Sequence, residues 1–297
     1  MPGMDDVTAA ELTWTREWPA RTSILVLAFS GYFDASSAAT AAVDHLIAHS
    51  AATPIAHIDG ERFFDMQQNR PHVELVDGTT RRVVWPETTL YANDEVSDGR
   101  ELVLLSGVEP HYAWRDYADL LIAVAEHTAA QVVVTLGATP GQTPHTRAPL
   151  VHSSSANPML ADRLGLHRPR YQGITGIVGV LQSELDARSR PAISMQVGVP
   201  HYAAGATDWK AAMALLRELE DVTGIPTGHA DLAPRAREWQ EMVDRAIADS
   251  AEAGAYVPQL EAMYDLRTSE DLPSSEDIAA EFERYLRELP EDPGPAS

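Results

Sequence analysis

The nearly continuous apolar run SILVLAFS, at residues 23–30, limits what this chain can fold into more than any other segment. A run of this length without polar alternation is typical of a strand that is buried on both faces of a sheet. Comparable runs alternate with segments of helical composition. The segments expected to form this alternation are 23–30, 37–49, 54–58, 101–106, 113–128, 131–136, 173–188, 192–199 and 208–224. The order predicts an α/β fold with a mostly parallel central sheet flanked by helices on both faces.

One stretch interrupts the alternation. Between residues 63 and 93 the chain breaks into short extended pieces, of which HVELVDGTTRRVVWP is the clearest. Asp77 and Gly78 form the dipeptide that favours a tight hairpin turn. We therefore expect an antiparallel insertion or an edge hairpin here.

The composition changes along the chain and predicts three parts. Residues 1–22 show no period, and with Trp14 and Trp18 they are expected to pack as an arm against the body. Residues 23–230 form the α/β core domain. Residues 231–297 hold seventeen acidic residues against six arginines, and their apolar stripes predict surface helices over 234–254 and 274–289. This last part is an acidic helical extension.

Charge and composition exclude several classes of protein. The net charge of −22 repels phosphate backbones, and the basic residues are scattered, so no nucleic-acid partner is expected. The absence of cysteine excludes disulfides and thiol catalysis and fits a reducing interior. The acidic N-terminus lacks a signal-peptide pattern, and no apolar stretch is long enough for a membrane span. We expect a cytoplasmic protein.

The candidate functional residues are those that follow the strands. In an open parallel sheet, ligands bind beyond the carboxyl ends of the strands. The segments GYFDAS, GVEPHYAW, GATPGQTPHTRAP and GVPHYAAG each follow an expected strand and bring polar side chains to one rim. The candidate ligand-binding residues of this rim are Tyr32, Asp34, Glu109, His111, His145, Arg147, His201 and Tyr202.

Each of these residues also has a purely structural interpretation. Asp34 can cap the alanine-rich helix or contact a ligand. Each PHYA repeat can be a turn in which histidine caps a carbonyl and tyrosine packs, which we favour over a binding role. Arg147, in the proline-stiffened loop 137–149, can clamp an anion, or it can pair with Glu109 or Asp34 and lock two loops together. The second interpretation is slightly favoured for Arg147.

The chain has no established catalytic signature. It contains no G-x-S-x-G elbow, P-loop, H-E-x-x-H or dinucleotide fingerprint. His111 and His201 could bind a divalent metal with Asp34 or Glu109, but loop histidines are more often capping groups. We expect no metal and no cofactor, and a binding protein rather than an enzyme.

Read together, the loop segments resemble the proteasome assembly chaperone 2 family, in its actinobacterial branch. The resemblance rests on the order of LAFSGYFDASSAA, GVEPHYAW, LGATPGQTPHTRAP, GITGIVGVL and PAISMQVGVPHYAAG, and it extends from about residue 23 to residue 228. It implies an α/β domain similar to the purine nucleoside phosphorylase or hydrolase fold. It also implies self-association, as a trimer or a multiple of it.

Eukaryotic relatives of this family hold proteasome α-subunits without catalysis and dock through a tail of hydrophobic residue, tyrosine and any residue. This chain ends in GPAS, so that docking device is not expected. Two hypotheses follow from the residues and the resemblance. The first is a non-catalytic homo-oligomeric chaperone-like or scaffold protein with a protein partner. The second is a small-molecule-binding protein or a phosphorylase-like or hydrolase-like enzyme that uses the rim.

Overall fold

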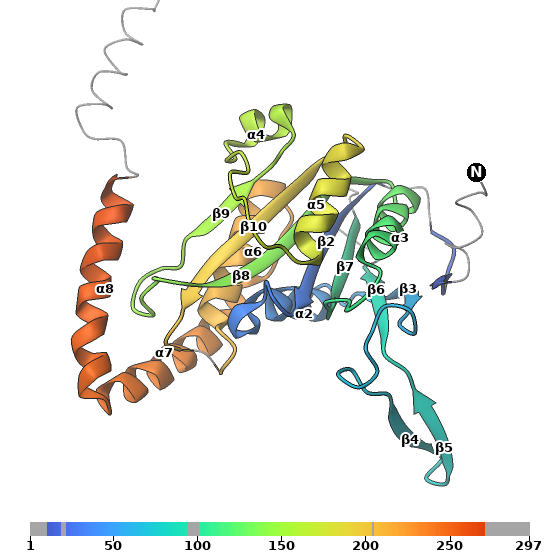
Figure 1. Ribbon diagram of the computed structural model, residues 1–297, viewed down its shortest axis with the longest axis horizontal. Helices are drawn as coiled ribbons and strands as arrows, with labels where there is room; N and C mark the ends of the chain where they lie inside the picture. Colours follow the sequence, from blue (N-terminus) through green and yellow to red (C-terminus); the bar gives the residue numbers. More distant parts are fainter. Residues whose placement is uncertain (1–10, 19–21, 94–100, 204, 271–297) are drawn as a thin grey trace, which may run out of the picture. The chain divides into compact units, whose positions relative to one another are not determined.

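The computed structural model describes residues 11–18, 22–93, 101–203 and 205–270. The chain forms two compact units, Met1–Ala246 and Ile247–Ser297. The first unit contains a central eight-stranded sheet with helices on both faces (Figure 1). In the second unit, the described element is the helix α8 (Ala251–Glu270).

The centre of the large sheet consists of four parallel strands. They are β7 (Glu101–Val108), β2 (Ser23–Ser30), β8 (Ala130–Gly141) and β10 (Ala192–Pro200), in that spatial order. Seven of the eight residues of β2 are buried. The continuous apolar runs therefore form the doubly covered middle of the sheet, as the sequence predicts.

The edges of the same sheet are antiparallel. On one side lie β6 (Glu87–Ala92), β3 (Thr53–Asp59) and β1 (Leu12–Trp14), and on the other side lies β9 (Val151–Ser154). The prediction of a mostly parallel sheet is thus wrong, because the sheet is mixed. A local pattern carries no information on strand direction. The alternating burial along β6 is typical of a peripheral antiparallel strand.

Helices cover both faces, which confirms the predicted α/β class. On one face, α2 (Ala38–His49) and α6 (Trp209–Thr223) pack over side chains such as Leu136 and Met195. On the other face, α3 (Trp114–His127) and α5 (Ile177–Ala187) pack over Leu25 and Leu27. The remaining short helices are η1 (Ala35–Ser37), α4 (Pro158–Leu164) and η3 (His229–Leu232), which leads into α7 (Ala233–Ala248).

The predicted hairpin is present as a separate two-stranded sheet. Strands β4 (His72–Val76) and β5 (Thr80–Val84) pair antiparallel, and Figure 1 shows them extending away from the large sheet. Asp77 and Gly78 have φ values of 55° and 74°. Positive φ at both central residues defines the type I′ turn that a two-residue hairpin loop favours.

Several predicted boundaries change. Strand β8 continues to Gly141 because its last residues still pair with β10, so the loop begins later than expected. Helix α5 begins only at Ile177. The single helix expected over 234–254 is divided, since α7 ends at Ala248 and α8 begins at Ala251. The helix expected over 274–289 lies outside the described residues.

Candidate functional site

The predicted rim residues do not form one site, because Tyr32 and Glu109 belong to one network at the carboxyl ends of the strands and His145 and Tyr202 belong to another. Glu109 is the centre of the first. Its Oε2 accepts a hydrogen bond from the backbone N–H of Tyr32 at 3.2 Å, and its Oε1 accepts one from the N–H of Ile177 at 2.8 Å. A carboxylate at the first residue of α5 also interacts favourably with the helix dipole. Glu109 therefore joins the β2 loop to the start of α5.

Two glycines make room for the Glu109 carboxylate. A Cβ atom on Gly31 would lie 2.7 Å from Oε2, and one on Gly176 would lie 2.2 Å from Oε1. Both distances are shorter than any ordinary contact. The Glu109 oxygens thus accept bonds from Tyr32 and Ile177, and the pairing of Arg147 with Glu109 or Asp34 stays a prediction.

Asp34 has the capping role that was one of its two interpretations. Its Oδ1 accepts hydrogen bonds from the backbone N–H of Ala39 at 2.8 Å and of Thr40 at 3.2 Å, and its Oδ2 accepts one from the Thr40 hydroxyl. Burial raises the pKa of Asp34, although these hydrogen bonds oppose the shift. The carboxylate thus serves the first turn of α2.

The two PHYA segments differ in structure. His111 turns toward the loop after β3, where its Nδ1 accepts a hydrogen bond from the N–H of Asp65 at 3.3 Å. His201 caps a carbonyl, because its Nδ1 lies 3.0 Å from the carbonyl oxygen of Gly141. Tyr112 is exposed, whereas Tyr202 bonds to His145. Only the second segment contributes to the network around His145.

His145 is the centre of the second network and is only 2% exposed. Its Nε2 donates to Oδ1 of Asp244 in α7 at 2.9 Å, and its Nδ1 lies 2.8 Å from the hydroxyl of Tyr202. In the neutral ring Nδ1 is then an acceptor, so the tyrosine hydroxyl donates to it. The same hydroxyl oxygen accepts from the backbone N–H of His145 at 2.9 Å.

The only lysine of the chain completes this network. The Nζ of Lys210 donates to the carbonyl oxygen of His145 at 2.7 Å and to Oε1 of Gln240 at 3.0 Å. Burial lowers the pKa of Lys210 and the nearby guanidinium of Arg147 lowers it further, whereas the carboxylates of Asp208 and Asp244 oppose the shift. Two cationic and two acidic side chains therefore lie close together next to the loop.

A buried acid lies at the start of α6. Asp208 caps this helix through Oδ1, which accepts from the N–H of Ala211 at 2.9 Å. Burial raises the pKa of Asp208 to about 6. Its Oδ2 has no hydrogen-bond partner within the described residues.

The chain Asp244–His145–Tyr202 can act in two ways. It can move a proton from the Tyr202 hydroxyl to the imidazole, with the carboxylate stabilising the imidazolium that results. It can equally lock the loop after β8 to α7, since both ring nitrogens of His145 are already occupied. Sequence reasoning found His145 and Tyr202 but missed Asp244, Lys210 and Gln240. Local patterns give no signal for contacts between such distant segments.

A cavity of about 530 Å³ lies beside the rim, between α5, β9 and β10. Ser194 and Gln196 of β10 line this cavity together with residues of α5. Arg168 and Arg170 also belong to its lining. The sequence analysis did not find this cavity, because its lining comes from four separate segments.

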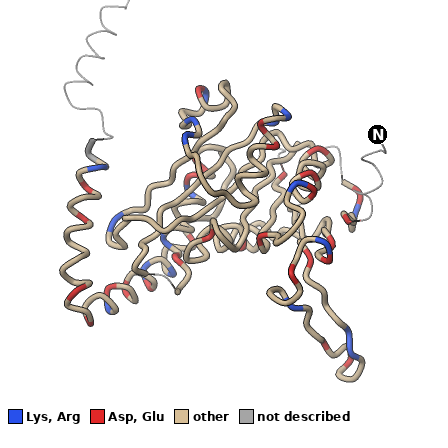
Figure 2. Tube along the Cα trace, viewed as in Figure 1, with Lys and Arg blue, Asp and Glu red and all other residues tan. Residues whose placement is uncertain are grey.

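Two further observations concern possible partners. Lys and Arg residues are scattered singly or in pairs along the described part of the chain (Figure 2). None of the helices within the described residues is long and apolar enough to cross a membrane.

Comparison with known proteins supports the resemblance seen in the sequence. The model of the PAC2 family matches residues 28–247. Among solved structures, a PAC2 family protein from Streptomyces avermitilis is 39% identical, covers 79% of this chain and 99% of its own, and has a TM-score of 0.74. A proteasome-assembly chaperone homologue from Mycobacterium tuberculosis is 40% identical over the same shares, with a TM-score of 0.70.

A more distant structure shares the fold alone. An archaeal proteasome activator from Pyrococcus furiosus is 18% identical, covers 80% of this chain and 98% of its own, and has a TM-score of 0.62. No curated protein matches this chain significantly.

Proposed function

The chain belongs to the PAC2 family, and on that premise we propose that it is a non-catalytic, homo-oligomeric, chaperone-like binding protein whose partner is another protein. The family and the name of the Mycobacterium tuberculosis relative support a chaperone-like role. The trimer, or a multiple of it, belongs to the same proposal, as does a cytoplasmic location.

The observation that carries the proposal is the amphipathic hairpin of β4 and β5. Val73, Leu75 and Val83 lie on one face of it, where Val73 pairs with Val83. Their exposed fractions are 59%, 60% and 47%. An isolated two-stranded hairpin is only marginally stable in water. A second protein surface over these three side chains would bury them and stabilise the hairpin.

The opposite face of the hairpin is more polar, although Val76 and Val84 also lie on it. There Glu74 accepts hydrogen bonds from Arg82 at 2.9 Å and from His72 at 3.3 Å. The pKa of Glu74 is lowered by these two partners, with Arg82 the larger cause. The first face carries a single charge, that of Arg81 opposite Leu75, and is therefore the face that favours contact with a protein. We propose that the protein that covers this face of the hairpin is a second copy of the same chain.

The experiment compares two single substitutions that each add one negative charge. Leu75→Glu places the charge on the apolar face, whereas Thr80→Glu, the control, places it on the other face near the turn. We expect Leu75→Glu to weaken self-association at least about tenfold in native mass spectrometry over a concentration series, since the new carboxylate loses its water when the contact forms and the cross-strand neighbour Arg81 offsets only part of that cost. Thr80→Glu should assemble like the wild type. Equal assembly of both variants would contradict the hairpin contact.

A second candidate function uses the rim. The Asp244–His145–Tyr202 chain, with Arg147 in the same loop after β8, favours a small molecule with an anionic group as the ligand. Under this proposal, gently purified protein carries an extra mass that Arg147→Ala removes while the fold stays intact. Arg163→Ala, on the exposed side of α4, is the control and should keep the mass. If Arg147→Ala unfolds the protein, the arginine is a structural residue.

A further inference from the structure

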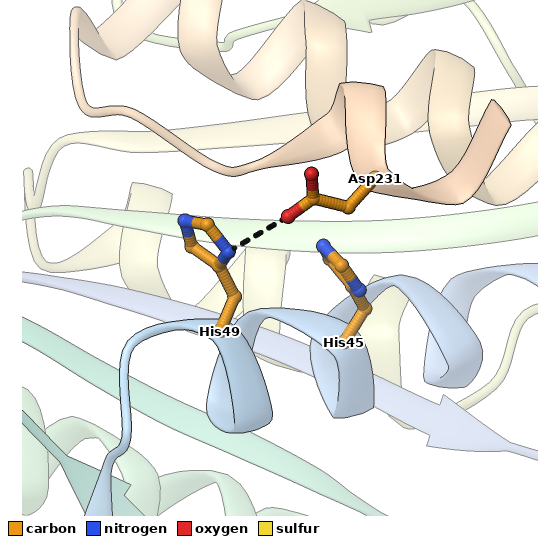
Figure 3. A group of neighbouring side chains, drawn as sticks. All are labelled: His45, His49 and Asp231. Carbon is orange, nitrogen blue, oxygen red and sulfur yellow. Dashed lines mark ion pairs between the residues drawn. The ribbon is translucent and has the colours of Figure 1, made fainter.

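Two histidines of α2 and one aspartate of η3 lie together on the α2 side of the sheet (Figure 3). His45 and His49 are four residues apart, which places both side chains on one face of the helix. Their ring centroids lie 5.7 Å apart and the ring planes are inclined by only 23°. Figure 3 shows the carboxylate of Asp231 reaching from η3 toward the two rings.

The distances among these three residues match the size of a metal ion. One ligand atom from each residue lies within 4.8 Å of the other two, and Nδ1 of His49 lies 3.3 Å from Oδ2 of Asp231. Zinc binds nitrogen and oxygen ligands at about 2.0 to 2.2 Å, so two tetrahedral ligand atoms are about 3.4 Å apart. The His49–Asp231 pair already has this separation, and only His45 has to move closer.

The backbone next to the cluster is shaped for it. Gly228 has φ of +65°, and a Cβ atom at this position would lie 2.4 Å from Nδ1 of His49. The carbonyl oxygen of the same residue lies 3.1 Å from Nε2 of His45. Both rings therefore lie against one glycine, whose carbonyl oxygen holds Nε2 of His45 beside the cluster.

The surroundings leave room for additional ligands. A cavity of about 630 Å³ borders the cluster, and its lining includes His45, Asp231, Asp44, Thr40 and Arg235.

We propose that His45, His49 and Asp231 form a binding site for a divalent transition metal of the zinc class, with solvent in the remaining coordination positions. Imidazole nitrogens select zinc, cobalt, nickel or copper, whereas calcium and magnesium prefer oxygen ligands alone. The metal would replace the hydrogen bond between His45 and the Gly228 carbonyl. It would also join α2 to η3, and so to the start of α7, which carries the Asp244 partner of His145.

The test titrates the full chain, stripped of metal by a chelator, with Zn²⁺ at neutral pH in a calorimeter. We expect one Zn²⁺ per chain and a rise in the unfolding temperature. His49→Ala and the isosteric Asp231→Asn should each weaken binding at least about tenfold, because each removes one ligand. Co²⁺ should give the visible absorption of a tetrahedral complex in the wild type and lose it in both variants.

The control changes a second histidine pair. His152 and His167 have ring centroids 6.4 Å apart, but within the described residues they form no cluster with a third His, Asp or Glu side chain. The double variant His152→Ala, His167→Ala should therefore keep full binding. Thermal unfolding of each variant without metal shows whether that variant is folded. If His49→Ala is not folded, the comparison with the wild type rests on Asp231→Asn. Absence of Zn²⁺ binding to the wild type, or equal binding by Asp231→Asn, would overturn the proposal.

Discussion

His145 and Asp244 are 99 residues apart in the sequence, yet Nε2 of the buried histidine donates to the aspartate Oδ1 over 2.9 Å. This bond joins the loop after β8 to α7. The histidine is buried, whereas the side chain of Asp244 is 50% exposed. The geometry makes this pair the first place to test whether the network holds the fold together.

Asp244→Ala should lower the free energy of unfolding by about 1 kcal/mol. The substitution leaves a buried donor on His145 without its partner, but water can reach the half-exposed site and replace part of the loss. Glu241→Ala, an exposed carboxylate on the same helix, is the control and should change stability by less than about 0.5 kcal/mol. Urea denaturation of the three proteins measures the difference. If the two substitutions lowered the free energy of unfolding equally, the hydrogen bond between His145 and Asp244 would contribute nothing to stability.

Asp208 predicts a defined pH dependence. Its pKa is raised from 3.8 to about 6 in the folded protein, so folding favours the protonated acid. The resulting stability is present below about pH 4 and is lost as the pH rises through about 6. Compared with Asp208→Asn, which keeps an oxygen for the Ala211 cap, the wild type should lose about 1 to 3 kcal/mol between pH 4 and pH 7.

The comparison with Asp208→Asn isolates this one carboxyl, because other groups titrate alike in both proteins. Urea midpoints at pH 4, 5, 6 and 7 provide the measurement. A stability difference that stays constant over this range would show that Asp208 titrates normally in the folded protein.

Glu109 should tolerate glutamine better than alanine. Glu109→Ala removes the acceptors for both Tyr32 and Ile177 and should cost about 1 to 2 kcal/mol, whereas Glu109→Gln keeps one acceptor oxygen and should cost less. The rate of hydrogen exchange of the Ile177 backbone amide should rise most in the alanine variant. If glutamine proves as costly as alanine, the charge matters more than the two hydrogen bonds.

Gly228→Ala should destabilise the protein by about 1 kcal/mol or more, because the residue has φ of +65° and the new Cβ would meet the His49 ring. The steric part of this cost should disappear when His49 is also changed to alanine. A double-mutant cycle of the two substitutions measures that part. If the costs of Gly228→Ala and His49→Ala are additive, the His49 ring moves aside without cost when alanine replaces Gly228.

The sequence predicted the features that depend on local pattern. The apolar run of β2, the Asp77–Gly78 turn and the Gly224 end of α6 all follow from residues close together in the chain. Resemblance of several loop segments to one family also placed the fold correctly, as the family match over residues 28–247 confirms.

The features that the sequence missed depend on distant segments. The antiparallel pairing of β3 with β6 follows from how the chain returns after the hairpin, and no residue pattern records it. Likewise, Asp244 reaches His145 only because α7 lies against the loop after β8. The division into residues 1–22, 23–230 and 231–297, the rim as a ligand site and the oligomer stay predictions.

The most direct test of the proposed function is native mass spectrometry of gently purified protein, compared with the mass after denaturation. We predict a single oligomer of three chains of 32.3 kDa, or a multiple of three, with no additional mass. A monomer at every concentration would contradict the oligomeric binding protein. An additional mass that disappears in Arg147→Ala would contradict its non-catalytic character and establish the rim as a ligand site.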